Sequence, residues 1–158
     1  MSRTPTAALS AALLLAVAFG CGGKKTTTGP NPGGTGAGLM SATIDGSPWT
    51  AIAVTTSLVS GGRIISGSDV ARSVAITFVA SGTGPQQTGS TSIVSCIIII
   101  GSQSWQAGLS KGGTGNVTIT TLTATRAVGT FVFTAPGSTA STTPATRVVT
   151  SGTFDVRL

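Results

Sequence analysis

The sequence predicts an all-β fold, a single antiparallel β-sandwich of about eight short strands that follows a signal peptide and a disordered tether. Three observations predict this class. Thr, Val and Ile are abundant, and they suit the pleated, half-buried surface of a sheet. Apolar residues alternate with polar ones over short windows, with no helical spacing sustained over about ten positions. Frequent turn residues fit a sandwich or a small closed β-barrel; the sandwich is preferred because nothing in the sequence specifies closure.

Residues 1–20 have the pattern of a signal peptide. One cation, Arg3, precedes an apolar run over residues 7–19, which is shorter than the roughly 20 residues that span a bilayer. The run ends at Cys21, and a Cys at the cleavage point resembles the lipobox of bacterial lipoproteins, whose thiol is diacylated. That resemblance implies anchoring by acyl chains on Cys21, and Gly22 after the Cys favours the outer membrane. The alternative is an ordinary signal peptide cleaved nearby, with Cys21 left as a free thiol.

Two further segments follow the signal peptide. Residues 21–38 are expected to form the lipidated Cys and a flexible Gly/Thr/Pro tether, because this stretch has no apolar period. Residues 39–158 are expected to form one β-domain, which is enough chain to bury a sizeable core.

The first third of the β-domain contains two strong turn signals. Asp45-Gly46 predicts a hairpin turn, and Gly61-Gly62 predicts a second reversal. Trp49 opens the return strand of the first hairpin. The strands expected here span residues 39–44, 49–59, 63–68 and 73–80.

Two loops and one apolar strand are expected next. Residues 82–90 contain Pro85 and are expected to be a loop. Residues 93–100 are apolar on both faces, so they should form a central or covered strand. Residues 101–115, around Trp105 and Leu109, are expected to be a second loop.

The last third has the clearest alternation. Its pattern shifts at Thr121, which predicts a bulge or bend. In the last strand Phe154 and Val156 should point inward and Asp155 outward. The strands expected here span residues 117–122, 128–133 and 147–158, with a reversal near residue 126 and a loop over 136–144.

Three segments of the chain together resemble a known family: ATIDGSPW at 42–49, the two strands within 115–131, and GTFDV at 152–156. They are similar to bacterial lipoproteins built on an uncharacterised β-domain that opens with an Ile-Asp-Gly-x-x-Trp hairpin and closes with Gly-x-Phe-x-Val. The resemblance covers most of residues 39–158. It implies no activity, cofactor or catalytic residue, because the family is uncharacterised.

Charge and cysteine content argue against a nucleic-acid-binding protein and against an intrachain disulfide. The formal net charge is +6, but residues 39–158 hold six cations and three acids, and the cations are scattered without interleaved aromatics. No nucleic-acid partner is therefore expected. With Cys21 lipidated, Cys96 has no disulfide partner and is expected to be a small buried hydrophobe.

The sequence offers little for catalysis. It has no His, Tyr or Glu, and its only acids are Asp45, Asp69 and Asp155. An enzyme would need one of these to converge with Lys111 or Cys96, which the spacing does not favour. No enzymatic activity, cofactor or metal site is expected.

The remaining candidates for ligand contact are two indoles. Trp49 is expected in the core; Trp105, flanked by polar residues, is either core or partly exposed, and is the candidate ligand contact. We expect a protein of the cell envelope, lipid-anchored through Cys21 to the outer membrane, with a non-catalytic domain that binds an envelope protein or glycan. The alternative is a carrier for a small apolar ligand inside a β-barrel cavity.

Overall fold

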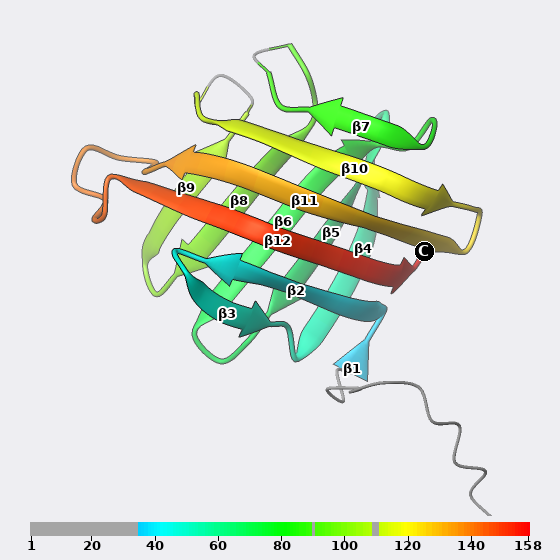
Figure 1. Ribbon diagram of the computed structural model, residues 1–158, viewed down its shortest axis with the longest axis horizontal. Coiled ribbons are helices and arrows are strands. Elements are labelled where there is room, and N and C mark those ends of the chain that lie inside the picture. The colour runs from blue at the N-terminus through cyan, green and yellow to red at the C-terminus, as the bar shows by residue number, and fades with distance from the viewer. Residues whose placement is uncertain (1–34, 90, 109–110) are drawn as a thin grey trace, which may run out of the picture.

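Two six-stranded sheets lie face to face in the computed structural model, which describes residues 35–89, 91–108 and 111–158 (Figure 1). The first sheet has the strand order β1-β4-β5-β6-β8-β9 and the second the order β3-β2-β12-β11-β10-β7. Every pairing is antiparallel except that of β1 with β4. The strands are β1 (Thr35–Gly36), β2 (Gly38–Ile44), β3 (Ser47–Thr50), β4 (Ala53–Val59), β5 (Gly62–Ser68), β6 (Arg72–Val79), β7 (Gly84–Gln87), β8 (Ser95–Ile100), β9 (Gln103–Ala107), β10 (Thr114–Leu122), β11 (Arg126–Pro136) and β12 (Thr146–Arg157).

The predicted all-β sandwich is confirmed, and the described residues contain no helix. The closed barrel is wrong, because both sheets end in edge strands that pair on one side only. The described residues form twelve strands rather than about eight. The extra strands are short ones that lie in segments expected to be tether or loop, or that come from dividing one expected strand in two.

The first hairpin forms at the predicted turn. Asp45 and Gly46 both have positive φ, 48° and 80°, as a two-residue turn between right-twisted strands requires. The return strand, however, does not run on to Val59. The amide of Ala51 still bonds the Met40 carbonyl in the second sheet, at 2.9 Å, whereas the amide of Ile52 bonds the Ser68 carbonyl in the first, at 2.8 Å. The chain therefore changes sheets within two residues, and the expected strand becomes β3 and β4.

Two segments expected to be loops are edge strands. β7 pairs with β10 and contains Pro85, which an edge strand tolerates because one of its sides needs no donors. β9 pairs with β8 and places Trp105 opposite Ile98. Both strands are short and rich in polar residues, so neither has the apolar alternation that marks a longer strand.

The apolar strand β8 is covered on one face only. Cys96 and Ile98 are fully buried against the second sheet, but Ile99 is 46% exposed on the outer face. The prediction of a central or covered strand is confirmed in its first form, because β8 lies inside its sheet, between β6 and β9, although its outer face is open.

The core between the sheets is filled in part by two interlocking Gly-Thr-Phe triplets. The triplets are Gly129-Thr130-Phe131 on β11 and Gly152-Thr153-Phe154 on β12, and they pair so that each Gly lies opposite the other triplet's Phe. A Cβ on Gly129 would come within 2.6 Å of the Phe154 ring, and one on Gly152 within 2.6 Å of the Phe131 ring. The glycines therefore make room for the two rings, and the threonine of each triplet points outward.

The predicted bulge and the predicted last strand are both confirmed. The pairing of β10 with β11 shifts register between Ile119 and Thr121. In β12, Phe154 and Val156 are buried, whereas Asp155 is partly exposed.

Candidate functional site

A groove of about 730 Å³ lies on the outer face of the second sheet, the face turned away from the core. This volume falls within the roughly 300–1,000 Å³ typical of small-molecule sites. Register shifts flank the groove in β10, near Thr120, and in β12, between Thr150 and Thr153. Bulges of this kind increase local twist, which explains why the sheet is hollowed here. The lining comes from five strands: Leu39, Met40, Ser41, Thr50, Thr120, Val128, Gly129, Thr130, Thr153, Phe154 and Asp155.

A row of hydroxyls crosses this groove. Thr130, Thr153, Ser41 and Thr50 are direct neighbours on four adjacent strands, β11, β12, β2 and β3. Their spacing is therefore the distance between strands, about 4.8 Å. Ser41 Oγ and Thr153 Oγ1 share a hydrogen bond of 3.0 Å. Each threonine also presents a methyl group, so the row offers both apolar and hydrogen-bonding contacts.

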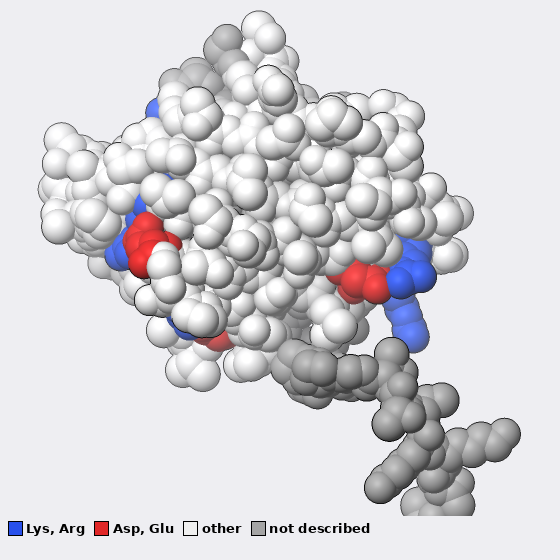
Figure 2. Space-filling view, viewed as in Figure 1, with Lys and Arg blue, Asp and Glu red and all other residues white. Residues whose placement is uncertain are grey.

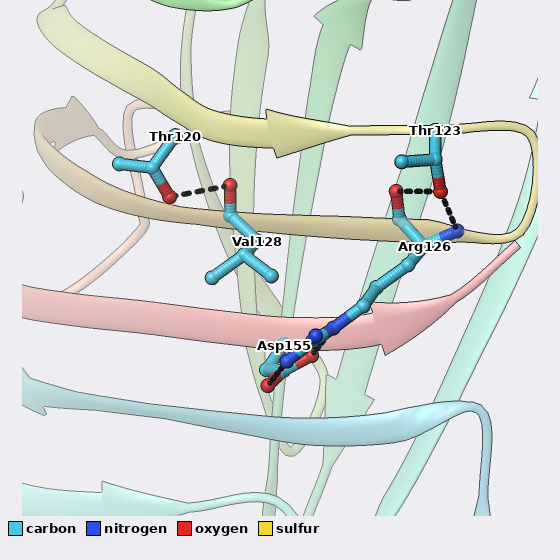
Figure 3. A network of polar contacts seen from close by, with 5 residues as sticks. All are labelled: Thr120, Thr123, Arg126, Val128 and Asp155. Carbon is cyan, nitrogen blue, oxygen red and sulfur yellow. Dashed lines mark hydrogen bonds and ion pairs between the residues drawn. The ribbon is translucent and has the colours of Figure 1, made fainter.

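The next row toward the carboxyl end of β12 has a carboxylate between two apolar side chains. Val128 lies opposite Asp155, and Asp155 lies opposite Leu39. Leu39 is 43% exposed, so an apolar surface is open to solvent beside the groove. Thr120 at the rim donates to the carbonyl of Val128, at 3.1 Å (Figure 3).

Two arginines form the row beyond. Arg126 and Arg157 are direct cross-strand neighbours, and both line a second hollow of about 310 Å³ that shares Leu39 and Asp155 with the groove. Arg126 donates two hydrogen bonds to Asp155, from Nε to Oδ1 at 2.8 Å and from Nη2 to Oδ2 at 2.6 Å (Figure 3). Opposed like charges destabilise a sheet pair, and this carboxylate offsets one of them.

The hydrogen bonds between Arg126 and Asp155 shift the pKa of both groups. The hydrogen bond from the Arg126 guanidinium holds the pKa of Asp155 below its ordinary value, and the same bond raises the pKa of Arg126. Thr123 Oγ1 accepts from the amide of Arg126, at 3.0 Å, and so fixes the turn from which this arginine extends (Figure 3).

The outer face around the groove is almost uncharged. Figure 2 shows this face in the same view as Figure 1, with charged groups gathered at its two ends and white atoms over β2, β10, β11 and β12 between them. The groove extends from the uncharged part to Asp155 at one end, and the two-arginine row follows there.

The two candidate residues from the sequence lie elsewhere. Cys21 is outside the described residues. Trp105 is fully buried; its Nε1 donates to the Pro144 carbonyl at 2.7 Å, and the Cζ of Arg147 lies 4.4 Å from its ring centroid. Trp105 is therefore core, the first of the two alternatives, and it offers no face to a surface ligand. Trp49 is core as predicted.

The three aspartates are held apart, each by its own arginine. Asp45 pairs with Arg147, Asp69 with Arg72 and Asp155 with Arg126, at 2.5, 2.8 and 2.6 Å. Within the described ranges, no three His, Cys, Asp or Glu side chains are grouped so that they could hold a metal ion.

The thiol of Cys96, on β8, lies in the core between the two sheets. It is fully buried, and this burial raises the pKa of the thiol well above its ordinary value. A thiol in such surroundings is a poor nucleophile.

Sequence reasoning missed the groove. The two Gly-Thr-Phe triplets contain a signal, because inward Phe side chains imply outward Thr side chains. The alignment of four hydroxyls, and of Arg126 with Arg157, depends on register between strands, which one sequence does not reveal.

Among the residues described, no helix is both long and apolar enough to cross a membrane.

The fold and the site define a β-sandwich domain with an open groove on the outer face of one sheet. The chain belongs to the family described as "Domain of unknown function (DUF6252)", whose model matches residues 37–156. The expectation of an uncharacterised domain family is confirmed at this level, and the match spans almost all of the described strands. No curated protein matches the sequence.

Proposed function

We propose that this protein is a lipid-anchored protein of the cell envelope, whose β-sandwich is a non-catalytic binding domain with the outer groove as its ligand site. The observation that carries the binding role is the groove of about 730 Å³, lined by Leu39, Val128 and threonine methyl groups on a nearly uncharged face. A mostly apolar groove of this volume lies within the range of small-molecule binding sites.

The anchor is supported by the sequence. Cys21 ends an apolar leader in the manner of a lipobox, and Gly22 favours the outer membrane. Thirteen residues separate Cys21 from Thr35, the first described residue. If they behave as the flexible chain that their composition predicts, they span about 20 Å on average, which lets the domain stand off the lipid surface.

A non-catalytic role fits the arrangement of polar groups. Each aspartate is engaged by an arginine, and Cys96 is enclosed in the core. A carrier with a ligand inside a barrel is not supported, because the sheets do not close. The apolar surface that such a role would need lies instead on the outside of the second sheet.

The anchor is tested by mass spectrometry of the amino-terminal peptide of the mature protein. We expect Cys21 to carry glycerol-linked acyl chains, and the Cys21→Ser chain to leave the membrane fraction. A mature protein with a bare Cys21 thiol, or a Cys21→Ser chain that partitions like the wild type, contradicts the anchor.

The groove is tested with N-phenyl-1-naphthylamine, a neutral apolar dye that fluoresces when it leaves water. The unlipidated chain from residue 21 with Cys21→Ser should bind it, since this chain includes every described strand. Thr153→Phe fills the groove and should abolish the signal. Thr55→Phe is the matched control on the outer face of the first sheet, where Thr55 is exposed on β4. No dye binding by the parent chain, or equal loss in both variants, contradicts the site.

A further inference from the structure

We infer that the groove binds a single-chain anionic amphiphile of the fatty-acid class, with its carboxylate at Arg157 and its alkyl chain along the groove. This inference rests on the proposed function, because it names the ligand class of the same groove. Three features carry it: the largely apolar floor, the unpaired cation at one end, and the lack of charge along the middle of the face.

The floor suits an alkyl chain. Beyond the arginine row, a ligand first meets Leu39 and Val128, which flank the carboxylate that Arg126 holds at Asp155. It then meets the methyl groups of the hydroxyl row at Thr130 and Thr153. The rows follow each other every two residues, so the hydroxyl row lies about 13 Å from the arginine row. Each methylene removed from water there contributes up to about 0.8 kcal/mol, less where the open groove leaves it partly wet.

The cation at the end of the groove is Arg157. The chain has only three acidic side chains, and all three lie among the described residues and pair with other arginines. Arg157 therefore stands opposite Arg126, a like charge, with no side-chain carboxylate of this protein left to neutralise it. Such a pair costs stability, and an anion placed between the two guanidiniums offsets that cost.

Arg126 has a different part in this arrangement. Its guanidinium already donates two hydrogen bonds to Asp155. It therefore contributes positive charge near the site but is not free to bind a ligand carboxylate in a bidentate manner. The side chains here sum to two cations and one anion, which complements one negative charge. A polyanion is disfavoured, because the middle of the face is uncharged and its other cations lie at the opposite end (Figure 2).

The test is a competition against the bound dye by dodecanoate and by dodecanol, which share an alkyl chain and differ in the charge of the head. Dodecanoate should displace the dye from the parent chain at a concentration about fivefold lower than dodecanol needs, which is the scale of an exposed ion pair. Arg157→Gln should remove this preference and leave displacement by dodecanol unchanged. Lys111→Gln removes the same charge outside the groove and should keep the preference.

Salt supplies a second readout. The preference for dodecanoate should shrink as ionic strength rises, because the ion pair at the mouth of the groove is exposed to solvent. Equal displacement by the two competitors, or loss of the preference in Lys111→Gln as well, overturns the assignment of an anionic head and leaves the groove as a binding site. Absence of dye binding by the parent chain overturns the proposed function itself.

Discussion

At the scale of single residues, each threonine of a Gly-Thr-Phe triplet serves the surface while its neighbours serve the core. Gly129 gives up a side chain so that the Phe154 ring can lie over it, and Gly152 does the same for Phe131. The threonines between them, Thr130 and Thr153, have no role in this packing. They are therefore free to line the groove.

Cys96 gives the sharpest test of packing at one residue. Cys96→Ser places a hydroxyl where the thiol is fully buried, and we expect the free energy of unfolding to fall by about 1–3 kcal/mol, because a buried hydroxyl loses its hydration. Denaturant unfolding measures the change. Cys96→Ala controls for lost volume, and a larger loss in the alanine variant than in the serine variant would contradict the polar explanation.

At the scale of the element, the β2–β3 hairpin depends on its turn. The Asp45 carboxylate accepts from the amide of Val148 at 2.8 Å and pairs with Arg147, so the turn is fastened to the start of β12. The hairpin is therefore part of the second sheet at both its strands and its tip.

Gly46→Ala tests this turn. Gly46 has a φ of 80°, and a Cβ there would meet nothing within 4 Å, so the whole cost comes from the backbone conformation. We expect a loss of about 1 kcal/mol in the free energy of unfolding, measured by chemical denaturation. Gly82→Ala is the control, because its Cβ also meets nothing and its φ is not in the left-handed region. Equal losses in both variants would show that the positive φ is not the cause.

The elements that the sequence predicts well are those with an uninterrupted period of two. The strand over 73–80 has Val74, Ile76 and Phe78 fully buried on one face, as its pattern requires. The β2–β3 turn and the β10 bulge were equally readable, because local chemistry determines them.

Other elements could not be predicted because distant partners define them. β7 exists because β10 offers it hydrogen bonds, and β9 because β8 does. Likewise, the division of residues 49–59 between two sheets depends on Met40 and Ser68, which accept from consecutive amides. The groove depends in the same way on register across four strands.

At the scale of the whole molecule, stability should respond to pH chiefly in acid. For Asp69, burial raises the pKa, but amide hydrogen bonds from Ala71 and Arg72 and the pair with Arg72 outweigh it, so the pKa lies below its ordinary value. The pKa of Asp155 is also lowered, by Arg126. Carboxylates with depressed native pKa values stabilise the fold above their unfolded pKa of about 3.9, and this contribution is lost as pH falls through the native values.

We therefore expect the thermal midpoint to be nearly level from pH 5 to pH 8, where the chain has no His to titrate, and to fall below about pH 4. Scanning calorimetry at fixed ionic strength measures it. The double variant Asp69→Asn, Asp155→Asn should start from a lower midpoint at pH 7 and lose less on acidification. An unchanged acid slope in that variant would contradict the assignment to these two groups.

The position of β12 has a consequence for the order in which the molecule can assemble. Strand β12, twelve residues long, follows the other described strands in the chain and lies between β2 and β11 in the middle of its sheet. Before it emerges from the ribosome, the β2–β3 hairpin has no neighbour to join it to β10 and β11. The second sheet, and with it the sandwich, consequently cannot be completed until residues 146–157 have been made.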